Sequence, residues 1–324
     1  MTAESGSPTP DRTPGKTPQS TPDRVPLTIG PAGVWSNFDR LPAADVVAFA
    51  HRAEALGYDA LWTQETAGRD PFALLAYLAA RTRRIRLGVG IAVTYGRDAV
   101  AMHAGAATVH ELSGGRMLLG IGVSHRDTVT AVRGHAYRGP LREMREYLDG
   151  YDQAVYRAPL PHGRPPLILA ALRMRMLQLA ATRADGAFPY LVPTEATAVA
   201  RRTLDVAAHE AGRPRPALIV SQACLLESDA DAARRAAHRY LDRYLGLPNY
   251  LANLREAGFS DAELVPPGAD RLVDALVAWG DAATIRDRLR AQLNAGADHV
   301  AIVPLSAAGL HADRATMEAL GPPW

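Results

Sequence analysis

The stretch IRLGVGIAVTYGRDAVAMHAGAATVHELSGGRMLLGIGV, residues 85–123, decides the fold class of this chain. It begins with a continuous apolar run at residues 85–93, which is typical of a strand buried on both faces. A helical pattern at residues 99–112 follows, and a Ser-Gly-Gly turn leads into a second apolar strand at residues 116–123. Strand, helix and strand in this order predict a parallel β-α-β unit.

The same alternation continues on both sides of this unit. Counting the unit itself, the predicted strands lie at residues 27–30, 58–62, 85–93, 116–123, 166–170, 186–189, 217–226 and 299–305. The predicted helices lie at residues 42–57, 71–81, 99–112, 142–156, 174–183, 194–211 and 281–294. Eight strands separated by helices predict an α/β fold, a parallel (β/α)8 TIM barrel.

One interval breaks the alternation. Residues 228–280 read as a mostly helical insertion before the last helix and strand. In a barrel, an insertion that follows a strand lies at the C-terminal face, where active sites are built. Two roles are open for this insertion, a cover over the substrate and a homodimer contact.

The first residues differ in composition from the rest. Residues 9–24 repeat a Thr-Pro motif every four residues and carry almost no large apolar side chain. Such a segment cannot bury enough surface to offset the entropy lost on ordering. We therefore expect residues 1–24 to be a disordered leader and residues 25–324 to form a single barrel domain.

Charge and cysteine content limit the function classes. The 324 residues include 36 basic and 34 acidic side chains, a net charge of +2, and one cysteine, Cys224. A nucleic-acid partner is disfavoured because there is no basic excess or basic block. No stretch approaches about 18 uncharged apolar residues, so a membrane partner is not expected either. A single cysteine fits a reducing, cytoplasmic location.

The residues that follow the predicted strands are poor in classical catalytic groups. They contain no paired carboxylates, no H-E-x-x-H motif and no His/Asp cluster with metal-ligand spacing, so no metal site is expected. The run GVSHR at residues 122–126 departs from the G-x-S-x-G motif at Arg126, which argues against a serine hydrolase. A site of this kind suits a cofactor that brings its own reactivity.

Glycines gather on two neighbouring predicted strands, at Gly88, Gly90, Gly120 and Gly122. Glycine lets a planar ligand approach the strand backbone closely, and it also relieves crowding inside a barrel. We favour the ligand explanation because the glycines cluster on adjacent strands, and the crowding explanation stays open.

Six segments carry a resemblance to one known family: residues 68–92, 111–125, 184–197, 244–259, 271–281 and 294–305. Together they are similar to the bacterial-luciferase-like superfamily of flavin and deazaflavin oxidoreductases, and within it to the group that uses coenzyme F420, a deazaflavin. The resemblance implies a barrel of the bacterial-luciferase-like type with the cofactor ring at its C-terminal mouth. It also implies a non-prolyl cis peptide bond between Gly90 and Ile91.

The resemblance further implies which residues hold the cofactor. The loop after the fourth strand would flank the ring, and the loop after the fifth strand would hold the phosphate at a helix N-terminus. This chain has Arg173 where the family usually has glycine, and a phosphate contact from Arg173 or Arg175 would replace the approach of the backbone. For Arg175, a solvated surface position is the open alternative. The expected cofactor-binding residues are Gln64, Gly90, Ile91, Ala92, Thr94, Gly122, Val123, Ser124, Ala170, Ala171, Leu172 and Arg173.

Two residues compete for the proton-transfer role. The family places a histidine or an Asp-His pair after the second strand, whereas this chain has Gln64 and Glu65 there. The catalytic candidates are Glu65, a carboxyl at that position, and His125, an imidazole whose ordinary pKa is about 6.5.

The sequence as a whole predicts a coenzyme F420-dependent oxidoreductase that transfers hydride between the deazaflavin and a small organic substrate. One alternative is an FMN-dependent monooxygenase of the same superfamily, in which reduced flavin reacts with dioxygen. The other is a non-catalytic protein that binds flavin or deazaflavin.

Overall fold

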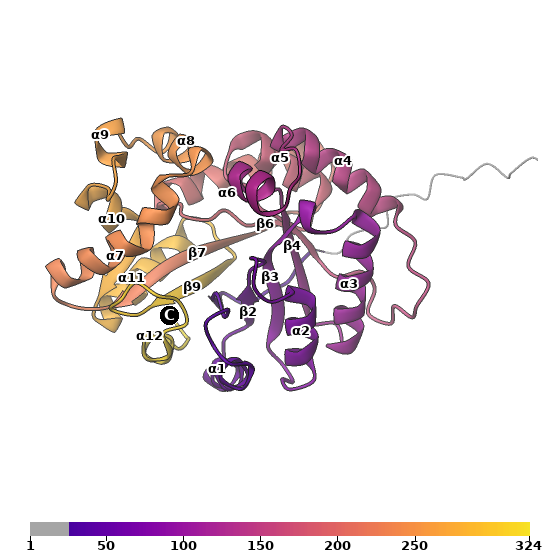
Figure 1. The fold of residues 1–324 in the computed structure, drawn as a ribbon, viewed down its shortest axis with the longest axis horizontal. Coiled ribbons are helices and arrows are strands. Elements are labelled where there is room, and N and C mark those ends of the chain that lie inside the picture. Colours follow the sequence, from indigo (N-terminus) through magenta and orange to yellow (C-terminus); the bar gives the residue numbers. More distant parts are fainter. Residues whose placement is uncertain (1–25) are drawn as a thin grey trace, which may run out of the picture.

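The computed structural model describes residues 26–324 (Figure 1). The leader expected at residues 1–24 lies outside the described residues and stays a prediction. The strands are β1 Ala32–Trp35, β2 Ala60–Thr63, β3 Arg86–Val93, β4 Met117–Gly122, β5 Leu167–Leu169, β6 Gly186–Ala187, β7 Ala217–Leu226, β8 Val277–Gly280 and β9 His299–Leu305. The helices are α1 Ala43–Leu56, α2 Pro71–Ala79, α3 Ala99–Leu112, α4 Pro140–Gln153, α5 Met174–Arg183, α6 Thr194–Glu210, α7 Ala230–Leu245, α8 Pro248–Glu256, α9 Asp261–Leu264, α10 Asp270–Leu276, α11 Ala282–Asn294 and α12 Arg314–Ala319, with short turns η1 Thr94–Gly96 and η2 Thr128–Val132.

Eight of the strands close into a parallel barrel. They follow the order β6-β5-β4-β3-β2-β1-β9-β7, and the pairing of β6 with β7 completes the ring. Helices surround this ring in Figure 1. The predicted (β/α)8 barrel is therefore confirmed.

The first strand lies later than predicted. β1 begins at Ala32, whereas the sequence pattern placed it at residues 27–30. Leu27 and Ile29 pack against a buried apolar cluster, and their spacing of two imitates the alternation of a strand. The residue between this segment and β1 is Pro31, which has no N–H to donate and which accepts a hydrogen bond from Val300 through its carbonyl oxygen.

The insertion is helical, as predicted, but it also contains a strand that the sequence pattern did not reveal. β8 pairs with residues 223–226 of β7. On this edge of β7, β6 pairs only with Ala217 and Leu218, so the later residues of the edge are left for β8. The four residues of β8 directly follow α10, so in sequence they read as a continuation of that helix. The last helix, α12, was not predicted either.

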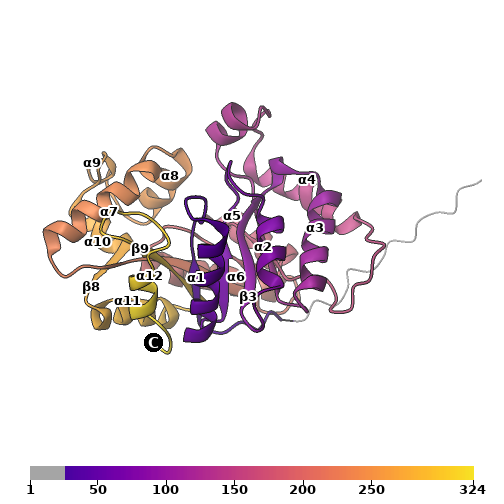
Figure 2. The ribbon, with the colours of Figure 1, turned by 60° about the horizontal axis from the view of Figure 1, so that its bottom comes forward.

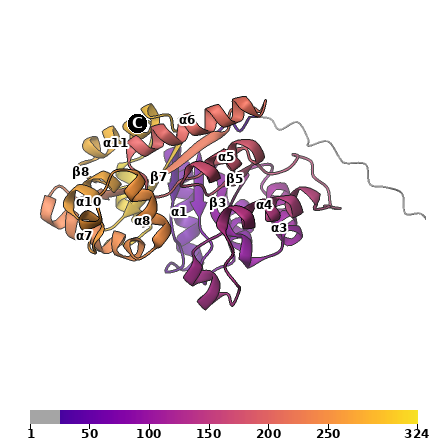
Figure 3. The ribbon, with the colours of Figure 1, turned by 90° about the horizontal axis from the view of Figure 1, so that it is seen from above.

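The insertion shares its hydrophobic core with the barrel. Trp62, Leu118 and Ile168 from the barrel strands belong to the same buried cluster as Tyr240 and Leu241 of α7. Figures 1, 2 and 3 place α7, α8 and α10 on one side of the barrel and α3 and α4 on the other. Within residues 26–324, no helix is both long and apolar enough to cross a membrane.

Candidate active site

A cavity of about 1270 Å³ opens where the barrel strands end. Most of the predicted site residues line it: Gln64, Glu65, Gly90, Ile91, Gly122, Val123, Ser124, His125, Ala170, Ala171, Leu172 and Arg173. Ala92 and Thr94 do not, and both side chains are buried. Ala92 belongs to the apolar layer between the barrel and its helices, so the prediction that it contacts a ligand is not supported.

The end of β3 forms part of the cavity wall through an irregular backbone. The peptide bond between Gly90 and Ile91 is cis, as the resemblance implied. The register of β3 against β4 shifts between Val89 and Ala92. The indole Nε1 of Trp35 donates a 2.7 Å hydrogen bond to the carbonyl oxygen of Gly90. This bond links the end of β1 to Gly90, the wall residue on β3.

Two of the four clustered glycines are explained by crowding rather than by a ligand. A Cβ at Gly88 would overlap the Trp62 ring inside the barrel. A Cβ at Gly120 would overlap the carbonyl oxygen of Val89. The ligand explanation is therefore wrong for Gly88 and Gly120.

The other two glycines line the cavity but are also tightly packed. A Cβ at Gly90 would lie 2.6 Å from the Phe188 ring. A Cβ at Gly122 would lie 2.8 Å from Cδ1 of Ile91 and 3.0 Å from Cβ of Ala170. Ile91 and Ala170 are themselves wall residues, so Gly122 acts on the cavity by letting these two side chains meet.

Glu65 is an anchor at the rim of the cavity. Its Oε2 accepts hydrogen bonds from the Val93 amide at 2.8 Å and from Arg97 at 2.7 Å. Its Oε1 accepts from Arg133 at 2.9 Å and from Arg97 at 3.2 Å. The side chain is only 6% exposed. Because both oxygens are occupied, the geometry does not support Glu65 as the proton-transfer group; it ties the ends of β2 and β3 to α3 and η2.

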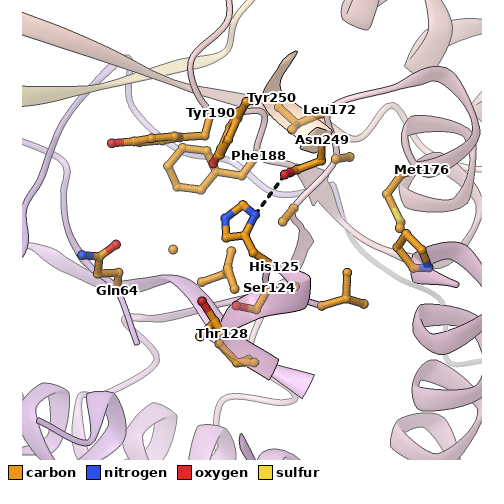
Figure 4. A pocket seen from close by; sticks show the side chains of 18 of the residues that line it. Gln64, Ser124, His125, Thr128, Leu172, Met176, Phe188, Tyr190, Asn249 and Tyr250 are labelled. Atoms are coloured by element: carbon orange, nitrogen blue, oxygen red, sulfur yellow. Dashed lines mark hydrogen bonds between the residues drawn. The ribbon is translucent and has the colours of Figure 1, made fainter. Parts of the chain in front are cut away.

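His125 is held by a residue from the insertion. The imidazole Nδ1 lies 3.0 Å from Oδ1 of Asn249 on α8, and its ring packs against Tyr250 (Figure 4). Burial lowers the pKa of His125 below its ordinary value, although Asn249 and Asp127 act in the opposite direction. Since Asn249 presents an oxygen, Nδ1 carries the hydrogen of the neutral ring. Nε2 is then left with a lone pair.

Aromatic side chains form the wall next to His125. Figure 4 shows Phe188, Tyr190 and Tyr250 grouped together, with Gln64 on the opposite side of the imidazole from Met176. The hydroxyl of Tyr190 lies 3.0 Å from that of Tyr244. Burial raises the pKa of both phenols, which keeps them as neutral hydroxyl groups.

Cations lie around the start of α5, in the loop after β5. The N-cap residue Arg173 gives the helix no side-chain cap, so the first amide groups of α5 have no partner within the helix. Arg173 pairs with Glu256 of α8 at 3.5 Å. Arg173 and Arg175 both line the cavity. This end of the cavity therefore offers positive charge and free N–H groups to an anion.

Metal and thiol chemistry find no support in the described part of the chain. No three His, Cys, Asp or Glu side chains within residues 26–324 are grouped so that they could hold a metal ion. Cys224 is buried in β7, and burial raises the pKa of its thiol.

The family of the chain follows from comparison with known proteins. The family model described as luciferase-like monooxygenase matches residues 20–299. The chain belongs to this luciferase-like family. The resemblance drawn from the sequence is thus confirmed at the family level.

Curated relatives match parts of the chain. A 5,10-methylenetetrahydromethanopterin reductase of Archaeoglobus fulgidus is 29% identical over 204 residues, which cover 57% of this chain and 61% of the relative. A putative coenzyme F420-dependent oxidoreductase of Mycobacterium tuberculosis is 36% identical over 140 residues, 42% of this chain and 40% of the relative. This luciferase-like chain therefore spans less than two thirds of the length of each.

Solved structures agree with the fold over nearly the whole chain. The coenzyme F420-dependent tetrahydromethanopterin reductase of Methanopyrus kandleri has a TM-score of 0.69 at 20% identity, covering 91% of this chain and 98% of that one. A type II Baeyer–Villiger monooxygenase component from Pseudomonas putida, solved with FMN, has a TM-score of 0.67 at 16% identity, covering 90% and 96%. Both likenesses support the luciferase-like barrel.

The sequence patterns did not reveal the site residues that the insertion supplies. Asn249 and Tyr250 lie in the segment YLGLPNY, which was expected at the C-terminal face but was not assigned a site role. Arg133 was missed because it lies in a loop with no periodic pattern. The insertion follows a barrel strand, and this position indicates that its residues, including those of α8, lie near the site.

Proposed function

We propose that this luciferase-like protein is a coenzyme F420-dependent oxidoreductase that moves a hydride between the deazaflavin and a small organic substrate. The observation that carries the proposal is the neutral His125, fixed by Asn249 on a cavity wall made of glycines and aromatic rings. Glycines and aromatic rings cannot carry out a redox step, so that step falls to a bound cofactor. His125 is the wall residue that can accept or donate a proton. The names of the curated relatives direct the choice of cofactor toward F420.

The residues present fit a ring cofactor with an anionic extension. The wall formed by Gly90, Gly122 and Ala170 presents backbone and small side chains to a flat ring. The free amide groups at the start of α5, together with Arg173 and Arg175, suit a phosphate. A volume of about 1270 Å³ leaves room for a substrate beside the ring.

When bound, the deazaflavin supplies the site that takes or gives the hydride. His125 handles the proton that accompanies it. Because burial lowers the pKa of His125, the ring is neutral near pH 7 and Nε2 accepts a proton better than it donates one. We therefore place His125 as the base that takes the proton of a substrate O–H or N–H group while the adjacent carbon loses its hydride.

Titration of the purified protein with coenzyme F420 and with FMN tests the proposal. We expect F420 to bind at least tenfold more tightly, a difference of about 1.4 kcal/mol. Equal or reversed affinities would point to the FMN monooxygenase, and consumption of dioxygen in the presence of reduced FMN would establish it.

A His125→Asn variant tests the catalytic part separately. We expect F420 binding to stay within about twofold while turnover falls by a factor of about 10² to 10⁴, the usual contribution of a general base. Tight F420 binding with no redox change by the parent protein, over a panel of alcohols and amines, would instead show a non-catalytic binding protein.

A further inference from the structure

Three of the tyrosines that line the cavity, Tyr190, Tyr244 and Tyr250, contact one another. The hydroxyls of the first two are engaged, because that of Tyr190 lies 2.6 Å from the hydroxyl of Tyr240 and 3.0 Å from that of Tyr244. Within residues 26–324, by contrast, the hydroxyl of Tyr250 bonds no other group, and it is not sealed off from solvent. It is therefore free to meet a ligand in the cavity.

This free hydroxyl lies close to His125. The rings of Tyr250 and His125 are 5.4 Å apart between centroids and tilted by 41°. Tyr250 directly follows Asn249, the partner of Nδ1, so α8 places two consecutive residues against the same imidazole. In Figure 4 the hydroxyl end of Tyr250 and the Nε2 edge of His125 face the same part of the cavity. One atom of a substrate can therefore contact both groups.

The phenol and the imidazole offer opposite hydrogen-bonding groups to such an atom. Burial raises the pKa of Tyr250 and lowers that of His125, so the phenol stays protonated where the imidazole is neutral. The phenol O–H donates, whereas Nε2 of the imidazole accepts. An atom that bonds both groups needs a lone pair and a hydrogen of its own. An alcohol oxygen has both, and the carbonyl oxygen formed from it keeps lone pairs for the phenol.

The charges on the cavity wall favour a neutral substrate. Among the described residues, the wall contains two carboxylates, Glu65 and Glu256. Two arginines hold Glu65, and Arg173 pairs with Glu256. An ammonium group would find no unpaired carboxylate on this wall, and it has no lone pair with which to accept from Tyr250. A neutral hydroxyl group is the better match.

We propose that Tyr250 is a second catalytic residue, which donates a hydrogen bond to the oxygen of a neutral alcohol and of the carbonyl compound formed from it. This inference rests on the proposed function. As the alcohol is oxidised, its O–H bond breaks and the proton passes to Nε2 of His125. The C–H bond breaks and the hydrogen leaves with both electrons as hydride to the oxidised deazaflavin, while the electron pair of the O–H bond forms the C=O bond. The phenol stabilises the negative charge that develops on the oxygen.

Tyr250→Phe tests the assignment, since it removes the hydroxyl and keeps the ring. Turnover with F420 is measured over neutral secondary alcohols and the amines of the same carbon skeletons, 1-phenylethanol and 1-phenylethylamine among them. We expect the parent to oxidise an alcohol of this panel in preference to its amine. The kcat of Tyr250→Phe with that alcohol should fall by a factor of about 10², as when one donor to a developing oxyanion is removed. The affinity for F420 should stay within about twofold, because the phenol donates to the substrate.

Inhibitors separate a contact with the oxygen from support of the wall. The pair is the ketone product of that alcohol and the alkene in which C=CH2 replaces its C=O group. We expect Tyr250→Phe to weaken inhibition by the ketone about fivefold, the contribution of one neutral hydrogen bond, and to leave inhibition by the alkene unchanged. Equal weakening of both inhibitors would show that Tyr250 only supports the wall.

Tyr77→Phe is the matched control, because it removes the same hydroxyl from an exposed position on α2. It should keep the kcat and the inhibition constants of the parent. Failure of the parent to oxidise any alcohol, or full activity of Tyr250→Phe, overturns the inference, and the proposed function stands if an amine is oxidised instead. If the parent does not bind F420, the proposed function itself is overturned.

Discussion

At the scale of the residue, the contact between His125 and Asn249 determines how the site handles protons. Asn249 presents its oxygen to Nδ1 at 3.0 Å, which selects the ring tautomer with its lone pair on Nε2. The two residues are 124 positions apart in the chain. The insertion therefore controls the chemistry of a residue that belongs to the barrel.

A change of Asn249 to Asp tests this control. A carboxylate at the same distance stabilises the imidazolium, so it raises the pKa of His125. Because the neutral ring is the active form, activity is lost as the pH falls through the pKa of His125, and Asn249→Asp moves this loss to higher pH. The measurement is kcat/KM against pH, with Asn294→Asp at an exposed position of α11 as the control. A profile that falls on the alkaline side instead would show that His125 donates the proton.

Gly122→Ala tests how closely the cavity wall is packed. The new Cβ would meet Ile91 and Ala170 at 2.8 and 3.0 Å, so these side chains must shift. We expect a loss of about 1–3 kcal/mol in the free energy of unfolding, together with weaker cofactor binding. Chemical denaturation and a cofactor titration on the same variant measure both effects. Unchanged stability with normal affinity would show that the wall adapts without cost.

At the scale of the element, Glu65 joins segments that are otherwise separate. It connects the end of β2 with the end of β3, the start of α3 and the end of η2. Arg97 and Arg133 are 14% and 19% exposed. Removing the carboxylate leaves Arg133 without an acidic partner and leaves Arg97 only Asp70, at 3.0 Å.

We therefore expect Glu65→Gln to destabilise the protein by roughly 3 kcal/mol, as breaking a buried ion pair does. Urea unfolding measures this, and Glu146→Gln, on the exposed face of α4, should change stability by less than about 1 kcal/mol. A fully stable Glu65→Gln protein with lost turnover would return Glu65 to the catalytic role.

Elements with strong local patterns could be predicted from the sequence to the residue. α3, α5, β7 and β9 have the predicted bounds, because each shows a clear helical period or a long apolar run between turn signals. β1 was placed too early because Leu27 and Ile29 imitate the alternation of a strand. β8 was missed because it follows α10 without a turn signal between them.

The candidate site was predicted only in part for a related reason. The C-terminal ends of the strands lie next to one another in any barrel of this kind. The barrel topology alone therefore predicts that the residues following the strands lie close together. The contacts of Asn249 and Arg133 depend on how a long insertion and an irregular loop fold back, and no local pattern encodes that.

At the scale of the whole molecule, buried histidines make the fold sensitive to acid. His299 lies in the barrel wall, where its Nε2 accepts a 3.1 Å hydrogen bond from Trp62 and its Nδ1 bonds the carbonyl oxygen of Gly30. Burial lowers the pKa of His299 to about 4. The unfolded chain, whose histidines have ordinary values of about 6.5, therefore binds a proton that the folded chain does not.

The stability contributed by the neutral His299 is present above about pH 6.5 and is lost as the pH falls toward 4. The shift corresponds to about 3 kcal/mol in the free energy of unfolding. We expect the melting temperature to fall steadily between pH 6.5 and 4.5. A His299→Gln variant should be less stable at pH 7 but lose less on acidification, whereas His209→Gln, on the exposed end of α6, should follow the parent curve. Parallel curves for all three proteins would contradict this explanation.

The short pairing of β6 with β7 leaves most of one edge of β7 to another strand. β6 pairs with only two residues of β7, and β8 pairs with the edge beyond them. Residues 228–280 are therefore hydrogen-bonded into the sheet through β8, and they also carry Asn249, the partner of His125. Replacing this segment would change one edge of the sheet and the support of His125 together.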